Sequence, residues 1–191
     1  MDKKTKALSG SGGNIYDNKI TDLQTGIDIK NVNGVKIYKV STGNIITFHL
    51  GSGTLTSNYY GISLDHCNNV FVHENSIDNT GNANSSTNLR GLNAVDCETA
   101  NICSNTIDKM GYSMYFDDDC QDTKVKLNNM TNYESAIRFN GAYFTTQGSA
   151  TETWENTFDN ALTTKKRLDG SFASGAGGID WYYNSANSNM D

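Results

Sequence analysis

The side chains in this sequence that could do chemistry are a few acids, histidines and arginines. Asp65 and His73 are of the types that act as general bases, and Arg90 and Arg138 are of the type that neutralises a substrate carboxylate. A base and a cation of this kind could remove the proton beside the carboxylate of a uronic acid. Because no complete catalytic signature surrounds them, we assign no catalytic residue, and Asp65, His73 and Arg138 remain candidates only.

An acidic segment offers a second kind of chemistry, which is cation binding. Carboxylate and carbonyl oxygens bind calcium in proteins, and four aspartates surround Cys120 at an expected turn: Asp117, Asp118, Asp119 and Asp122. A solvated acidic turn explains the same residues, so calcium is the one cofactor that we retain as an option. Zinc is not expected, because the 4 cysteines show no C-x-x-C spacing and the 3 histidines lie near none of them in a zinc-like pattern.

The composition limits the classes of partner. The 191 residues carry 21 Asp and Glu against 15 Lys and Arg, a formal net charge of -6, which opposes binding to nucleic acid or to an anionic lipid surface. No stretch approaches the ~20 consecutive apolar residues of a membrane-spanning helix. With 36% apolar residues, 18 glycines and no proline, the chain is expected to form one domain with a narrow core and many tight turns.

A repeated phrase indicates the elements that position these residues. The hexapeptide ENSIDN at 74–79 returns as ENTFDN at 155–160, and looser copies stand at 17–22, 104–109 and 128–132. The shortest spacing, 22 residues, defines the unit, and longer spacings indicate insertions at its corners. Val40 occupies the marker position of one unit, where we expect an altered bend. Asparagine occupies it in the others: Asn18, Asn75, Asn105, Asn128 and Asn156.

Within one unit the apolar residues come in pairs two positions apart. Ile62 and Leu64 form one pair and Val70 and Val72 the next, whereas a helix would space them by three and four. Short strands are therefore expected, separated by Gly, Asn and Asp. Three strands in so small a unit cannot pair as hairpins, so successive units must stack in parallel.

Over residues 14–160 this pattern resembles the right-handed parallel β-helix repeat proteins of the pectate-lyase-like superfamily. The resemblance rests on the Asn phrase and on a second phrase that begins at Gly26, Gly61 and Gly91. It implies an all-β, single-stranded right-handed parallel β-helix, a solenoid of about six coils, with the asparagines stacked as an inward ladder at a tight bend. Residues 1–13 are then a flexible or capping segment, and 161–191 a long loop with a partial last coil or a boundary to further chain.

The resemblance also bears on the enzymatic candidates. A His-Glu pair such as His73 and Glu74 occurs in the catalytic motif of alginate epimerases with this fold, but the flanking FVHEN lacks the Asp and Pro that complete that motif. Of the polygalacturonase signatures only an Asp-Asp pair is present. The pattern therefore argues against a hydrolase and leaves a lyase or epimerase as the enzymatic alternative.

One column of the repeat collects Cys67, Cys97 and Cys120, with Val32 in the coil before them. The apolar Val32 indicates that this column points inward. Stacked side chains that point the same way rarely reach the dihedral angle of a disulfide, so buried free thiols are expected. Cys103 falls in a different column and is expected to face outward.

Insertions at one corner indicate where a ligand would bind, because loops of this kind commonly frame the binding face of a solenoid. Extra residues leave the chain just before the Gly-initiated strand: 13 between Thr42 and Ile62, 8 between Ile77 and Leu92, and 14 between Phe158 and Ile179. A mixed row of acids, amides, aromatic rings and cations suits a polyhydroxylated ligand. The carbohydrate-binding candidates beside this corner are Asp28, Lys30, Tyr59, Tyr60, Ser63, Asp65, Arg90, Asn93, Tyr115, Asp117 and Arg138.

Three functions are compatible with this pattern. The first is an extracellular or cell-surface β-helix module with a structural or adhesive role, whose partner is a polysaccharide or cell-surface glycan. The second is a polysaccharide lyase or uronate epimerase, and the third is a phage tail-spike-like protein. We favour the non-catalytic module, because its coils are few for an enzyme of this superfamily. Further coils of the same protein or another subunit are expected to cover the ends of the solenoid.

Overall fold

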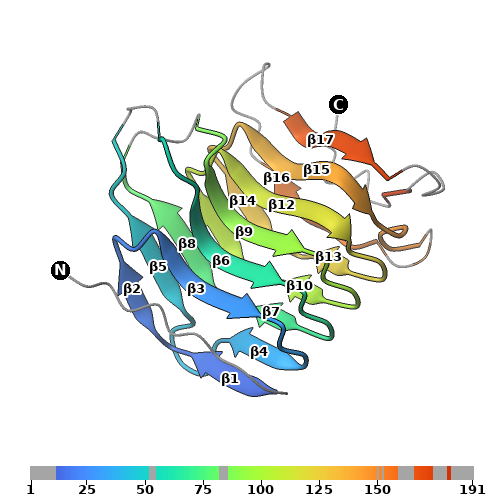
Figure 1. Ribbon diagram of the computed structural model, residues 1–191, viewed down its shortest axis with the longest axis horizontal. Coiled ribbons are helices and arrows are strands. Elements are labelled where there is room, and N and C mark those ends of the chain that lie inside the picture. The colour runs from blue at the N-terminus through green and yellow to red at the C-terminus, as the bar shows by residue number, and fades with distance from the viewer. Residues whose placement is uncertain are drawn as a thin grey trace.

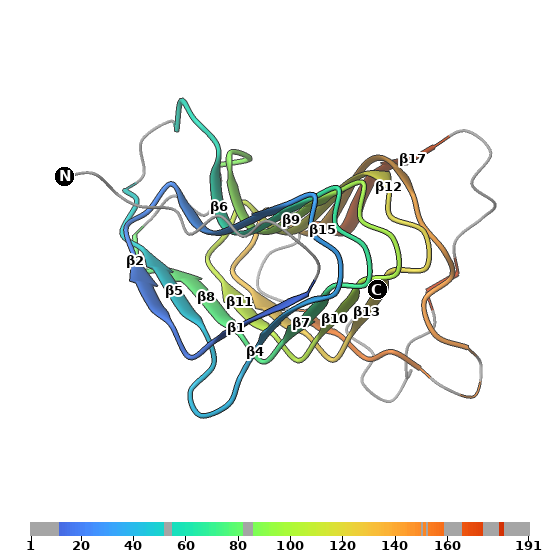
Figure 2. The same ribbon diagram turned by 60° about the horizontal axis from the view of Figure 1, so that its bottom comes forward.

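The structure of the protein is a computed structural model that describes residues 12–51, 55–81, 86–149, 151, 153–158, 166–173 and 180–181. Every regular element in this part of the chain is a strand, and the strands form three parallel sheets wound along a solenoid (Figure 1). The oblique view in Figure 2 shows the three sheets as the sides of the coil. The predicted parallel β-helix is therefore confirmed.

Each sheet takes its strands from successive coils. Sheet A consists of β3 (Thr25–Lys30), β6 (Tyr59–Asp65), β9 (Leu89–Val95), β12 (Tyr112–Asp119), β15 (Ser135–Tyr143) and β17 (Lys166–Phe172). Sheet B consists of β1 (Gly13–Tyr16), β4 (Val35–Tyr38), β7 (Phe71–His73), β10 (Asn101–Cys103) and β13 (Lys124–Lys126). Sheet C consists of β2 (Lys19–Thr21), β5 (Ile45–Phe48), β8 (Ser76–Asn79), β11 (Thr106–Asp108), β14 (Asn129–Thr131) and β16 (Thr157–Phe158).

The core consists of columns of stacked side chains. Because successive side chains of a strand point to opposite faces, alternate positions of each strand recur on the inside of every coil. Sheet A has two such columns of buried residues, Ile29, Leu64, Ala94, Phe116 and Phe139 in one and Ile27, Ile62, Leu92, Met114 and Ile137 in the other. Each column takes one residue from each coil, which explains how a chain with 36% apolar residues fills its interior.

The asparagine ladder runs along the bend between sheets B and C. The side-chain amide of Asn75 donates to Oδ1 of Asn105 over 3.0 Å, and Asn105 repeats this contact to Asn128 over the same distance. Each amide also donates to the carbonyl oxygen two residues earlier in its own coil, such as that of His73 for Asn75. Asn18 begins the ladder and Asn156 ends it, so the five predicted asparagines all take part.

The sixth ladder position belongs to Asn44, and the assignment of Val40 to it is wrong. Val40 is 63% exposed, whereas Asn44 is fully buried and donates to Asn75 Oδ1 over 2.7 Å. Residues 40–43 bulge out of the bend, and the Asp17 carboxylate accepts their four backbone N–H groups over 2.8 to 3.2 Å. The bend is altered as expected, but it contains four of the 13 extra residues that the sequence count places between Thr42 and Ile62.

Most corners are closed by residues other than glycine in the left-handed region. After sheet A, the residues Asn31, His66, Asp96 and Asp118 have φ between 52° and 55°. Asn and Asp adopt this conformation at low cost because their short polar side chains bond locally to the backbone. The abundance of Asn and Asp between the apolar pairs is thus a consequence of the corners.

The cysteine column is buried, as predicted. Cys67, Cys97 and Cys120 are free thiols with no exposed area, and Val32 lies in the same inward position. Cys103 faces outward as predicted, in one row with His73 and Lys126, but it is only 5% exposed. Its side chain is shorter than its two neighbours in the row, and this difference explains why solvent does not reach it.

The last coil differs from the sequence prediction. The insertion counted to Ile179 assumed that sheet A continues there, whereas β17 pairs with β15 from Ser135↔Lys166 to Ala142↔Phe172. The predicted 14-residue insertion is therefore wrong, and Ile179 itself lies outside the described residues. No described strand lies beyond β17 in sheet A, so its Leu168 and Phe172 are 39% and 42% exposed.

Candidate functional site

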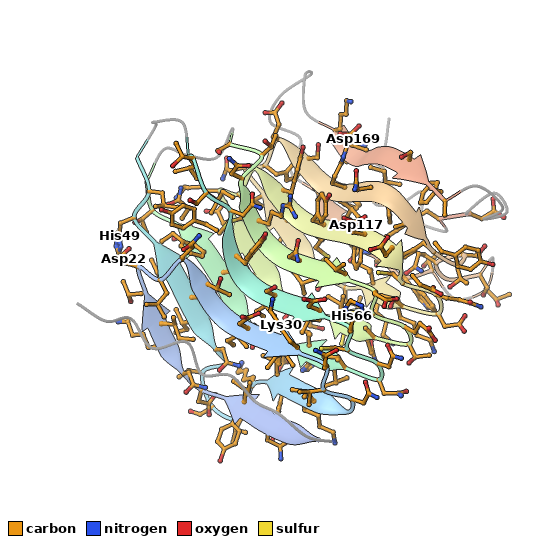
Figure 3. The ribbon with its side chains drawn as sticks, viewed as in Figure 1. Asp22, Lys30, His49, His66, Asp117 and Asp169 are labelled. Carbon is orange, nitrogen blue, oxygen red and sulfur yellow. The ribbon has the colours of Figure 1, made fainter. Side chains whose placement is uncertain are left out.

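Most of the predicted carbohydrate-binding residues lie on the outer face of sheet A, in rows that cross the strands. Figure 3 labels Lys30 and Asp117 among them. One row consists of Asp28, Ser63, Asn93, Tyr115, Arg138 and Asp169. The next consists of Lys30, Asp65, Val95, Asp117, Asn140 and Ser171. The register brings the candidates of five coils onto one face. Asp169 was missed because no apolar pair marks β17.

Arg90 organises the aromatic part of this face. Its guanidinium carbon lies 3.6 Å from the centre of the Tyr115 ring and 5.7 Å from that of Tyr60. Its Nη1 donates to Asn93 Oδ1 over 2.7 Å, while its Nε is buried without a partner in the protein. The Tyr112 ring stacks on Tyr115, with centroids 5.8 Å apart. Tyr112 was not among the predicted residues, although it occupies the same row as Tyr60 and Arg90.

Three predicted residues of the face are not accessible. Ser63, Asn93 and Tyr115 are 6%, 4% and 8% exposed. Arg90 lies over Tyr115 and donates a hydrogen bond to Asn93, so Tyr115 and Asn93 lie beneath Arg90 and help to position it. The predicted residues of this face that retain accessible area are Asp28, Lys30, Tyr60, Asp65, Arg90, Asp117 and Arg138. The assignment of Tyr59 to this face is wrong, because Tyr59 pairs with the buried Leu89 and its ring packs against Phe48 with centroids 6.5 Å apart.

Asp65 belongs to a chain of charges at the corner after β6. Its carboxylate contacts Lys30 Nζ over 3.3 Å and His66 Nδ1 over 2.6 Å, and the other ring nitrogen of His66 lies 3.2 Å from Asp96. Partial burial opposes ionisation of Asp65, but the bonds to His66 and Lys30 outweigh it and lower the pKa of Asp65. The bond to Asp65 in turn raises the pKa of His66. Asp65 is therefore a poor general base.

Arg138 is held by a second group of charges. Its Nη1 bonds the Asp169 carboxylate, which Lys166 Nζ also contacts over 2.7 Å. Burial opposes ionisation of Asp169, but the bonds from Lys166 and Arg138 outweigh it and lower the pKa of Asp169. Three strand positions separate Asp65 from Arg138, about 14 Å at the usual strand spacing. The two candidates cannot act on one sugar ring.

His73 lies on a different side of the molecule. It belongs to β7 of sheet B, where its ring stacks on Phe71 with centroids 5.3 Å apart and its Nδ1 lies 3.5 Å from Glu74. Sheet A carries the other two catalytic candidates. The structure therefore does not bring Asp65, His73 and Arg138 together.

The four aspartates proposed for calcium do not converge. Asp117 accepts a hydrogen bond from the Asn140 amide over 3.1 Å, and Asp119 accepts one from the backbone N–H of Gln121 over 3.0 Å. Asp118 sits at a left-handed corner between them. Within the described residues no group of three or more His, Cys, Asp or Glu is placed to hold a metal ion.

A separate cavity of about 860 Å³ lies over the outer face of sheet B in its last coils. Asn101 and Lys124, which are paired across β10 and β13, line it together with Tyr143 and Trp154. Asn101 Oδ1 and Trp154 Nε1 are buried without a partner in the protein. An unpaired buried polar atom costs roughly 1–3 kcal/mol, so these two atoms need an explanation.

Comparison of the chain with family models, with curated proteins and with solved structures gives no match. In the described part of the chain, no helix has the length and apolar character required to cross a membrane.

Proposed function

We propose that this protein is an extracellular β-helix module that binds a polysaccharide on the outer face of sheet A without cleaving it. The observation that best supports this proposal is the cluster that Arg90 forms with the rings of Tyr60, Tyr112 and Tyr115. Sugar rings present C–H faces that pack on aromatic surfaces, and their hydroxyl groups bond to charged and amide side chains. The cluster lies where β6, β9 and β12 begin, and long segments of the sequence precede β6 and β9.

A binding role agrees with the state of the acids on this face. Asp65 and Asp169 are each held by two cationic side chains, and the pKa of each is lowered. A lyase or epimerase needs a base whose pKa lies near the working pH. The charged groups are thus suited to hold a ligand and poorly suited to take up a proton.

The proposed location follows from the class of ligand. A repeating face about six strands long, roughly 24 Å at the usual strand spacing, accommodates a polymer rather than a metabolite. Such polymers occur at cell surfaces and outside cells. The resemblance to the pectate-lyase-like superfamily supports the same class of ligand.

The proposal is tested on a glycan array followed by calorimetry with the polysaccharide that binds. Arg90→Ala and Tyr112→Ala should weaken binding by ~10-fold or more, because each removes contact area and a positioned donor or ring. Tyr38→Ala, which changes a tyrosine on sheet B, is the matched control and should bind like the wild type.

Absorbance of unsaturated uronates, measured on the same polysaccharides, distinguishes the enzymatic alternative. Accumulation of such products would replace the binding module by a lyase, and an altered uronate composition without cleavage would indicate an epimerase. A trimer in size-exclusion chromatography would favour the tail-spike alternative.

A further inference from the structure

The cavity over sheet B has a wall that is hydrogen-bonded to the preceding coil. The described residues between β15 and β16, which are 144–149, 151 and 153–156, form no regular strand. Gln147 anchors this wall, since its Oε1 accepts the backbone N–H of Val125 over 2.8 Å and its Nε2 donates to the carbonyl oxygens of Thr123 and Thr145 over 2.9 Å. Gln147 is fully buried. Gln147 thus ties the wall to the preceding coil beside the cavity of about 860 Å³.

The polar groups of the cavity include one donor and one acceptor without a protein partner. Trp154 Nε1 can only donate a hydrogen bond, and Asn101 Oδ1 can only accept one. Each exposes less than 1 Å², so bulk water does not satisfy them either. A ligand hydroxyl group can both donate and accept, and it would complement both atoms.

The charged and aromatic side chains of the cavity limit the classes of ligand that it can bind. Lys124 Nζ lies 5.8 Å from the centre of the Trp154 ring, and Tyr143 adds a second ring to the lining. Asp122 supplies one negative charge against the positive charge of Lys124. Because these two charges cancel, we expect the ligand to be neutral. Because both unpaired atoms are covered in the free protein, binding requires side chains of the cavity to change rotamer, and the exposed side chains of Asp122 and Lys124 can do so.

We propose that this cavity is a second carbohydrate site, which binds a neutral mono- or disaccharide with Trp154 Nε1 donating to one hydroxyl group and Asn101 Oδ1 accepting from another. It lies on sheet B, whereas the face proposed for a polymer lies on sheet A. The site is therefore independent of the polymer-binding proposal. It selects the end or a short branch of a glycan, because the wall closes one side of the cavity.

The test uses the two indole N–H signals in proton–nitrogen NMR spectra, since the chain contains 2 tryptophans. Trp154→Phe identifies the Trp154 signal by its loss. The wild-type protein is titrated with maltose, cellobiose and xylobiose, and with digalacturonate as the charged comparison. We expect at least one neutral disaccharide to shift the Trp154 signal saturably. Digalacturonate should bind at least ~10-fold more weakly, because the opposite charges of Lys124 and Asp122 give no net charge to compensate the desolvation of its two carboxylates.

Variants then locate the contact. Asn101→Ala should weaken the affinity by ~10-fold, because it removes the acceptor. Lys36→Ala changes a residue in the same outward row of sheet B and should have no effect. Arg90→Ala on sheet A should leave the Trp154 titration unchanged, which separates this site from the polymer face.

The proposal is overturned if none of the three neutral disaccharides shifts the Trp154 signal up to its solubility limit. It is also overturned if the shift persists unchanged in Asn101→Ala, or if digalacturonate binds as tightly as the neutral sugars. None of these results would affect the glycan-array test of sheet A.

Discussion

Asn44 donates a hydrogen bond from its side-chain amide to Oδ1 of Asn75, one coil further along the solenoid, over 2.7 Å. The Asn75 amide passes the contact on to Asn105 and also bonds the carbonyl oxygens of Ile37 and His73. A single buried amide therefore satisfies backbone groups of two coils. Hydrogen bonds in such a chain polarise one another, which strengthens the series.

Asn75→Ala should lower the free energy of unfolding by roughly 3–4 kcal/mol, because it leaves buried carbonyl oxygens unpaired and creates a cavity. Asn18→Ala is the matched control at the exposed start of the ladder, where the loss should be about 1 kcal/mol. Urea unfolding followed by circular dichroism measures both. Equal losses at the two positions would mean that burial of the ladder contributes little.

The repeat made the three sheets, the inward columns and the ladder predictable, because the same local chemistry recurs in each coil. Val40 was misplaced because a count based on the shortest spacing cannot show which residues of a longer unit bulge outward. The Asp17 side chain that stabilises this bulge belongs to the previous coil. Its partners become evident only once the coils are stacked.

The sequence repeat predicted which residues share a row on the candidate face, but it did not predict the side-chain contacts within and between these rows. Register fixes that Asn93 and Tyr115 are neighbours, whereas it does not fix that Arg90 folds over both. Long side chains choose among rotamers according to neighbours in three dimensions. The cavity at Trp154 was missed for a related reason, since the described residues 144–149 and 153–156 form no strand of the repeat.

Leu127 occupies a corner position that suits a different residue. It has φ of 57° and is 57% exposed, directly before Asn128 of the ladder. Leu127→Asn should raise the free energy of unfolding by about 0.5–1 kcal/mol, because Asn adopts the left-handed conformation at lower cost. Thermal unfolding measures the change.

Val40→Asn separates this backbone effect from the removal of an exposed apolar side chain. Val40 is also exposed, but its φ is not positive. We expect a change near zero there. A gain of the same size at both positions would show that surface polarity, and not the conformation of Leu127, is responsible.

The contacts of His66 with Asp65 and Asp96 make stability depend on pH. The bond to Asp65 raises the pKa of His66 above its ordinary value of 6.5. Its stabilising contribution is therefore fully present below pH 6.5 and is lost as the pH rises through the folded-state pKa. The melting temperature of the wild type should decrease over that range relative to His66→Asn, in which Asn can keep the left-handed corner.

An NMR titration of the His66 ring gives the folded-state pKa directly, and Asp96→Asn should lower it by removing one of the two carboxylates. The pKa of Asp65 is lowered from 3.8, so the carboxylate side of this group contributes fully above pH 3.8 and is lost as the pH falls below it. A His66 pKa at or below 6.5 would contradict the ion pairs described here.

The four thiols should report unfolding of the solenoid. All four cysteines are free and buried, and burial raises the pKa of Cys120 to about 12. Because a buried thiol reacts with a disulfide reagent only after its coil opens, the native protein should react with Ellman's reagent ~1000-fold more slowly than the unfolded chain. In guanidinium the reagent should count 4 thiols, the full number in the sequence. A thiol that reacts at once in the native protein would show that its coil opens locally, and Asn75→Ala should increase that rate if the ladder closes the coils around the cysteine column.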